Sequence, residues 1–178
     1  MPARVTLAFD PIRRAAVLWE RRWGRASAPQ SMAAATSVMR VQQLLLASYD
    51  AALAPYGLTF PRFEALTLLE FSREGRLPMS KVSDRLMVHP TSATHIVKRL
   101  AEQGFVERLP NPDDGRGTLA AITPAGRAVV AEATSALVDC GFALGALTGP
   151  ERVELFRLLE KVRVGAGDFD DIASASER

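Results

Sequence analysis

Two short amphipathic segments separated by a tight turn constrain this 178-residue chain more than any other feature. The first runs from Pro78 to Leu86 and carries apolar residues at helical spacing. Residues 87–89 form the connection, and Pro90 stands at a preferred first position of a second helix. That helix continues to Gln103, where Gly104 is a typical C-terminal cap. The pattern predicts a helix-turn-helix.

A β-hairpin is predicted directly after these helices. Phe105–Leu109 and Leu119–Ile122 have the composition of strands, and residues 110–117 between them are rich in Gly, Pro, Asn and Asp. A helix-turn-helix followed by a hairpin is a winged helix. We therefore expect a mainly α fold, a winged helix-turn-helix with a two-stranded β wing.

Long helical patterns flank this unit. Asp10-Pro11 begins a short amphipathic helix, and Thr148–Glu151 forms a capping box for a last helix whose inward residues are expected to be Val153, Phe156, Leu159 and Val162. The expected organisation is an N-terminal helix and linker (1–30), a long helix (31–60), the winged helix-turn-helix (61–122), C-terminal helices (123–164) and a disordered tail (165–178).

Composition excludes several classes of protein. The chain has 22 Lys and Arg against 20 Asp and Glu, a net charge of +2, which permits a polyanionic partner without requiring one. No apolar run reaches the roughly 18 residues of a membrane span, so we expect no membrane association and a cytoplasmic location. One cysteine, Cys140, and two histidines exclude a disulfide framework and a structural zinc site.

No enzymatic motif is evident. The sequence has no phosphate-binding glycine loop, no nucleophile motif and no acid–base pair at a defensible spacing. We therefore expect no catalytic residue, no cofactor and no bound metal.

The winged segment resembles a known family. "LTFPRFEALTLLEF" and "LPMSKVSDRLMVHPTSATHIVKRLAEQGFVERLPNPDDGRGTLAAITPAGRAV" are similar to the multiple-antibiotic-resistance regulator (MarR) family, from about Val41 to Leu159. Asp114-Gly115-Arg116 and Thr123-Pro124-Ala125-Gly126 fill the family's wing and helix-start motifs. The resemblance implies a homodimer in which residues 31–60 and 123–164 form the dimerisation helices, with double-stranded DNA as the partner.

Arg116 is the candidate for contact with DNA by the wing. A narrow minor groove concentrates negative potential, and a guanidinium can bond the acceptor edges there. Asp114, two residues earlier, is positioned to orient Arg116 through an ion pair. The alternative is an ordinary loop with a solvated arginine.

The second helix of the motif carries the other candidates for contact with DNA. Its hydroxyls and basic groups can meet phosphates or base edges near the helix start. His95 stands where many relatives carry a base-reading arginine. Thr91 or Ser92 has capping of the helix as its alternative role, and the two basic residues have simple solvation. The full set is Thr91, Ser92, Thr94, His95, Lys98 and Arg99.

The basic N-terminal helix resembles that of a urate-responsive subset of the family. Trp19 and Arg108 match ligand-binding positions, Glu64 stands in the place of an aspartate, and His95 replaces an arginine. This resemblance implies a site for a small organic anion. The alternative is that Trp19 is an apolar anchor. For Cys140, core packing is favoured over the oxidant sensing known in some members.

These features predict a homodimeric, ligand-responsive regulator of transcription. It is expected to act as a repressor that binds a pseudo-palindromic operator and is released by a small organic anion. The alternative is a winged-helix module used for protein–protein contact without sequence-specific DNA binding.

Overall fold

The computed structural model describes residues 7–112 and 114–169, with the side chains of residues 114–116 outside that description. The α-helices are α1 (Pro11–Trp23), α2 (Pro29–Leu53), α3 (Phe60–Phe71), α4 (Met79–Leu86), α5 (Pro90–Glu102), α6 (Pro124–Asp139) and α7 (Gly149–Gly165). The strands are β1 (Arg76–Pro78), β2 (Val106–Asn111) and β3 (Asp114–Ile122). Three short 3₁₀ turns are η1 (Arg25–Ser27), η2 (Ala54–Tyr56) and η3 (Gly141–Ala143).

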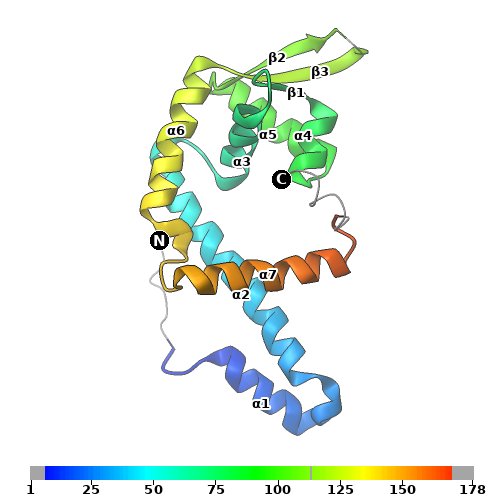
Figure 1. The fold of residues 1–178 in the computed structure, drawn as a ribbon, viewed down its shortest axis with the longest axis vertical. Helices are drawn as coiled ribbons and strands as arrows, with labels where there is room; N and C mark the ends of the chain where they lie inside the picture. Colours follow the sequence, from blue (N-terminus) through cyan, green and yellow to red (C-terminus); the bar gives the residue numbers. More distant parts are fainter. Residues whose placement is uncertain (1–6, 113, 170–178) are drawn as a thin grey trace.

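The mainly α, winged helix-turn-helix prediction is confirmed, but the sheet has a third strand (Figure 1). The strand order is β1-β3-β2, and β1 pairs antiparallel with β3, Arg76 opposite Ala121. The sequence predicted a two-stranded wing and a helix that begins at Pro78, with no strand before it. A three-residue strand has no periodicity of its own, because it is defined by the strand that it pairs with.

The wing is longer than predicted, and the expected loop at 110–117 is wrong. β2 continues to Asn111 and β3 begins at Asp114. Pro110 is tolerated within β2 because β2 is an edge strand, where a missing backbone N–H leaves no partner unsatisfied. A register shift between Pro110 and Asn111 accommodates the irregularity.

Local capping signals fix the helix starts as expected. The Asp10 carboxylate accepts the Ile12 N–H at 2.9 Å, which begins α1. In the capping box of α7, the Thr148 N–H donates to Glu151 Oε2 at 2.7 Å and Thr148 Oγ1 accepts the Glu151 N–H. These contacts lie within three residues along the chain, which is why sequence alone located them.

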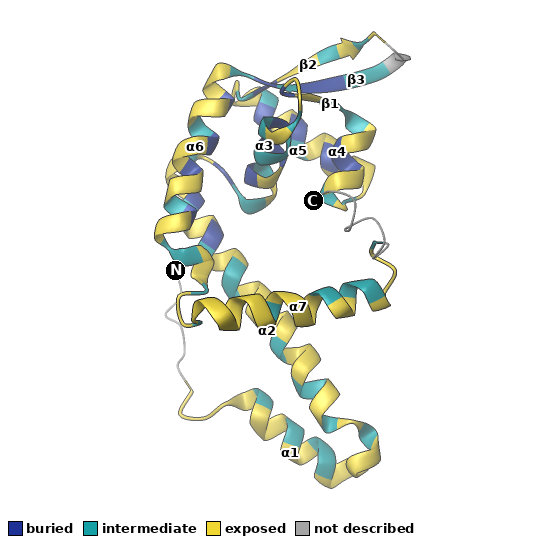
Figure 2. Ribbon diagram, viewed as in Figure 1, coloured by how far each residue is buried: buried dark blue, intermediate teal, exposed yellow. Residues whose placement is uncertain are grey.

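The buried core lies in the winged lobe, by which we mean residues 58–139 together with the last two turns of α2 (Figure 2). Gly126 allows the start of α6 to lie close to Phe105, because a Cβ at this position would collide with the Phe105 carbonyl oxygen. Cys140 packs against the core, as predicted, with Sγ 3.2 Å from the Leu137 carbonyl oxygen. The largest fully buried side chains are Leu53, Leu66, Leu69, Val82, Val97, Leu100 and Leu137.

The rest of the molecule is built differently. α1, residues 29–44 of α2 and α7 form what we call the distal lobe, and neither α1 nor α7 has a buried residue. The four α7 residues predicted to point inward are 37–69% exposed, so that prediction is wrong within one chain. Inward packing requires a surface to pack on, and no described part of the chain covers the apolar face of α7.

The predicted linker after α1 is a tight turn. η1 folds α1 back onto α2, and the Trp19 indole N–H donates to the Ser27 carbonyl oxygen at 3.1 Å. At the other end, α7 reaches Gly165, and residues 170–178 of the expected disordered tail lie outside the described residues. Among the helices described, none combines the length and apolarity needed to cross a bilayer.

Candidate nucleic-acid interface

The two faces of α5 differ completely in burial. Ala93, Val97 and Leu100 are buried against the core and fix the rotation of the helix about its axis. The opposite face points to solvent and carries the polar candidates that the sequence predicted. All six are exposed: Thr91, Ser92, Thr94, His95, Lys98 and Arg99.

His89 caps the start of α5, a role that the sequence left open as the alternative for Thr91 or Ser92. Its Nδ1 accepts the Thr91 N–H at 3.3 Å. The hydroxyls of Thr91 and Ser92 are therefore not used as caps, whereas Thr94 Oγ1 donates to the Pro90 carbonyl at 2.9 Å. Pro90 at the first helical position was the available signal, because it makes the preceding residue the cap.

Two cations near the C-terminal end of α5, Lys98 and Arg99, share one acid, Glu102. Arg99 Nη1 lies 2.9 Å from Glu102 Oε2, and Lys98 Nζ lies 4.0 Å from Glu102 Oε1. Exposed pairs of this kind contribute about 0–1 kcal/mol, so they do not prevent exchange of Glu102 for a phosphate. The face remains cationic.

A side-chain network anchors the C-terminal end of α5. The Gln103 amide donates to the Gly57 carbonyl at 2.9 Å, and Arg62 Nη1 donates to Gln103 Oε1 at 3.1 Å. The Arg62 Nε–H also donates to Thr59 Oγ1, which joins the network to the start of α3. The helix is thus held at both ends while its outer face stays open.

The wing projects from the sheet beyond the helices (Figure 1). The backbone of Asp114 and Arg116 belongs to β3, and Asp114 is paired with Asn111 near the tip. The side chains of Asp114 and Arg116, and hence the predicted ion pair between them, lie outside the described residues. The backbone of both residues lies in the projecting β2–β3 hairpin.

The predicted ligand residues do not meet within one chain. Glu64, His95 and Arg108 are exposed residues of α3, α5 and β2 in the winged lobe. Trp19 lies in α1, at the opposite end of the molecule (Figure 1), where its ring packs on Trp23 with a centroid distance of 4.5 Å. A site that combined all four residues would therefore require a second subunit.

Glu64 of α3 has a carboxylate that is partly shielded from water. This desolvation raises the pKa of Glu64 above its ordinary value, although the residue as a whole is exposed. The ionised form of Glu64 is therefore less favourable than that of a fully hydrated carboxylate.

Comparison with known proteins agrees with this geometry. A family model described as "MarR family" matches residues 58–118. The HTH-type transcriptional repressor Rv2887 of Mycobacterium tuberculosis is 34% identical over 69% of this chain and 88% of its own length. The chain belongs to the MarR family.

Solved structures of MarR regulators share the fold. Sco5413 of Streptomyces coelicolor, a MarR family transcriptional regulator, is 56% identical, with 80% of this chain and 99% of that chain covered and a TM-score of 0.74. Sco3205 of the same organism, solved in complex with DNA, is 26% identical over 73% of this chain and 83% of its own, with a TM-score of 0.68. This MarR protein is accordingly a DNA-binding regulator of transcription and not an enzyme.

Proposed function

We propose that this protein is a homodimeric repressor that binds a pseudo-palindromic operator and is released by a small organic anion. The observation that carries the proposal is the division of α5 into a buried apolar face and an open face of hydroxyl, imidazole and basic side chains. A helix held in this way can enter a major groove without rearrangement of the lobe. DNA bound there meets Thr91, Ser92, Thr94, His95, Lys98 and Arg99.

His95 sets the expected character of base readout. An imidazole offers fewer hydrogen bonds than the forked guanidinium that reads guanine. α5 is therefore expected to discriminate between bases less strongly than it would with an arginine at this position. Contacts to phosphate supply much of the affinity, so binding falls steeply as salt is added.

Arg116 is proposed as the minor-groove contact, oriented by Asp114. The projection of β2 and β3 beyond the helices supports this role, because the arm can reach a groove next to the one occupied by α5. Phosphate contact alone would not require an oriented side chain.

The dimer is proposed from the surface of the distal lobe. Large apolar side chains are exposed along α1, α2 and α7, and exposed apolar patches mark sites of protein–protein contact. A second copy of the chain would cover them and place two α5 helices about one turn of DNA apart. The exposed residues of the distal lobe are Val17, Leu18, Trp23, Val38, Met39, Val41, Val153, Phe156, Leu158, Leu159 and Val162, and Leu46 follows them along α2.

Selection of bound DNA from a random pool tests the function directly. We expect a two-fold symmetric sequence with half-sites about one helical turn apart, recovered with the full chain. Recovery of no preferred sequence favours the alternative of a protein–protein interaction module. Recovery of a single asymmetric half-site contradicts the dimer.

The wing contact is tested on the selected DNA. Arg116→Ala is expected to weaken binding by about 1–3 kcal/mol with the fold unchanged. Arg25→Ala is the matched control, because Arg25 lies in η1, away from the wing, and pairs only with Glu20 among the described residues. Equal affinities for the two variants in a gel-shift titration count against the wing contact.

A further inference from the structure

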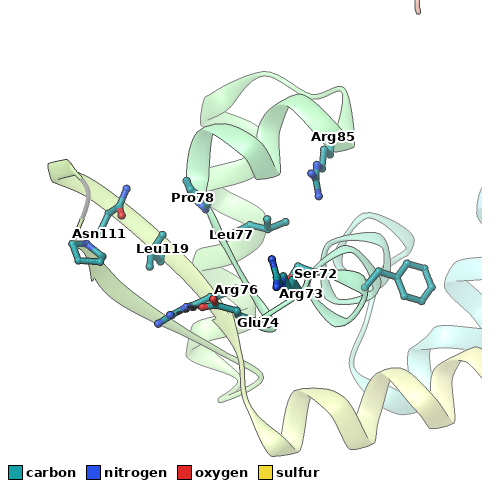
Figure 3. A pocket seen from close by; sticks show the side chains of 11 residues that line it. Ser72, Arg73, Glu74, Arg76, Leu77, Pro78, Arg85, Asn111 and Leu119 are labelled. Carbon is teal, nitrogen blue, oxygen red and sulfur yellow. Dashed lines mark hydrogen bonds and ion pairs between the residues drawn. The ribbon is translucent and has the colours of Figure 1, made fainter. Parts of the chain in front are cut away.

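A cavity of about 450 Å³ lies beneath the wing, and none of the predicted ligand residues lines it. We call it the sub-wing cavity. Its walls come from the end of α3 and the following turn, from β1, from α4, and from the base and arm of the wing (Figure 3). Its size falls within the range typical of small-molecule sites.

The charges around the sub-wing cavity are unbalanced. Arg76 is neutralised by Glu74, whose carboxylate accepts from both Nε and Nη2 of the guanidinium. Arg73 and Arg85 also line the cavity, and neither forms an ion pair or hydrogen bond with any residue that the structure describes. Figure 3 shows Arg85 extending from α4 towards Ser72 and Arg73. Two cations thus line one hollow, and no acid among the described residues pairs with either of them.

The remaining walls combine the polar residues Ser72 and Asn111 with an apolar part. Leu119 of β3 is buried in the sheet, and Leu77 and Pro78 of β1 line the cavity beside it. Phe71 stands at the end of α3 with 82% of its surface exposed, an unusual position for a phenylalanine. Covering this ring and the half-buried Leu77 would gain hydrophobic free energy that a bare phosphate cannot supply.

We propose that the sub-wing cavity binds a small organic anion with an apolar body, the carboxylate held by Arg73 and Arg85. A guanidinium binds a carboxylate through two parallel hydrogen bonds, which gives the site its preference for this group. The apolar body of the ligand then lies against Leu77 and Leu119. This assignment places an effector site within a single chain, where the residues predicted from sequence do not form one.

Occupancy would also affect the binding of DNA, a consequence that rests on the proposed function. Arg85 belongs to α4, the first helix of the helix-turn-helix, whereas Leu119 and Pro112 belong to the wing. A ligand that contacts both fixes the angle between wing and helices. If the ligand binds more tightly to an angle other than the one in the DNA complex, operator affinity falls. The loss equals the difference in the ligand's binding free energy between the two angles.

Calorimetric titration of the full chain tests the site without DNA. The probes are benzoate, inorganic phosphate and benzyl alcohol, which separate the contributions of charge and apolar body. We expect benzoate to bind once per chain, with phosphate and benzyl alcohol at least tenfold weaker. No heat with benzoate at millimolar concentration, or phosphate binding as tightly, overturns the proposal.

Variants locate the probe. Arg73→Gln/Arg85→Gln, which keeps the length of both stems, is expected to weaken benzoate binding at least about tenfold, since each charged hydrogen bond contributes roughly that factor. Arg25→Gln is the matched control and is expected to bind as the unmodified protein does. If Arg108→Gln abolishes binding and the double variant does not, the anion binds elsewhere and the assignment is wrong.

The two proposals fail in different ways. If the protein binds benzoate in the sub-wing cavity but selects no DNA sequence, the result supports the anion site and contradicts the proposed repressor function. With selected DNA in hand, we expect benzoate to change its affinity at least threefold in the unmodified protein and not in the double variant. Benzoate binding with unchanged DNA affinity overturns the coupling.

Discussion

The winged lobe and the distal lobe contain similar apolar side chains but differ in what covers them. In the winged lobe, leucines of α3, α5 and α6 are fully buried by neighbouring elements of the same chain. In the distal lobe, no residue of α1 or α7 is fully buried, although their apolar residues recur at the same helical spacing. Periodicity therefore reports that a helix has an apolar face, and does not report which molecule will cover it.

The largest effect is expected from the core of the winged lobe. Leu100→Ala removes a fully buried side chain beneath the open face of α5 and is expected to cost about 2–5 kcal/mol of unfolding free energy. Denaturant titrations at two protein concentrations should give the same loss, because the packing is within one chain. If the loss of unfolding free energy depends on protein concentration, the packing around Leu100 involves a second chain, and the two lobes do not differ in this respect.

The distal lobe should show the opposite dependence. Phe156 is 59% exposed in the single chain, and the Arg163 Cζ lies over its ring, 5.7 Å from the ring centroid. Phe156→Ala is expected to weaken association by about 2 kcal/mol, roughly 30-fold, while the dilute protein loses little stability. Sedimentation equilibrium measures the association constant. An unchanged constant would show that α7 is not part of the interface.

Sequence located most helices because their ends are marked locally. Asp10, Thr123 and the Thr148 capping box act within three residues, and each begins a helix where predicted. β1 was missed because it depends on pairing with β3 across a long sequence separation. The hairpin loop was predicted too long because Pro110 and the residues after it read as a loop, although they pair with β3. Edge position, which allows Pro110 in β2, is a property of the sheet and not of the residue.

The candidate site also has a part that the sequence could predict and a part that it could not. The solvent face of α5 followed from helical spacing, and the six predicted residues share it. The sub-wing cavity could not be predicted, because Arg73, Arg85 and Leu119 come from elements that only the folded chain brings together. The ligand set that includes Trp19 was transferred by resemblance, and within one chain that residue has a structural contact instead.

Trp19 provides the next test of the distal lobe. Trp19→Phe removes the hydrogen bond to the Ser27 carbonyl and keeps most of the ring, and it is expected to cost the α1–α2 turn about 0.5–1.5 kcal/mol. Tryptic cleavage after Arg25 should accelerate roughly two- to tenfold, since cleavage follows local opening. Trp23→Phe is the control, because no hydrogen bond of the Trp23 indole is found among the described residues. Equal cleavage rates for both variants contradict the anchoring role.

A smaller effect of opposite sign is expected in the turn of the helix-turn-helix. Met87 has φ of 53° and ψ of 41°, a left-handed conformation in which its Cβ is strained, and its side chain is exposed. Met87→Gly is expected to stabilise the winged lobe by about 0.5–1 kcal/mol. Met39→Gly, within α2 of the distal lobe, should destabilise by about 1 kcal/mol. Thermal unfolding of the two variants checks the opposite signs.

The smallest expected effects concern pH, and they differ in sign between the lobes. Desolvation raises the pKa of Glu64 in the winged lobe, so its contribution to stability is present below the unfolded-state pKa and is lost as pH rises through the folded-state pKa. Hydrogen bonds from the Thr148 backbone and hydroxyl lower the pKa of Glu151 in α7. Its contribution is present above the unfolded-state pKa and is lost as pH falls through the folded-state pKa.

Two isosteric variants separate these contributions. Glu64→Gln should gain stability relative to the unmodified protein as pH rises from about 4 to 6, because only the unmodified protein then carries a desolvated charge. Glu151→Gln keeps an acceptor for the capping box and should lose stability relative to the unmodified protein over the same range, because it lacks the negative charge at the start of α7. Unfolding midpoints measured at each pH give both differences. Parallel pH profiles for the two variants would mean that the acids of the two lobes share one environment, which the opposite shifts of their pKa values argue against.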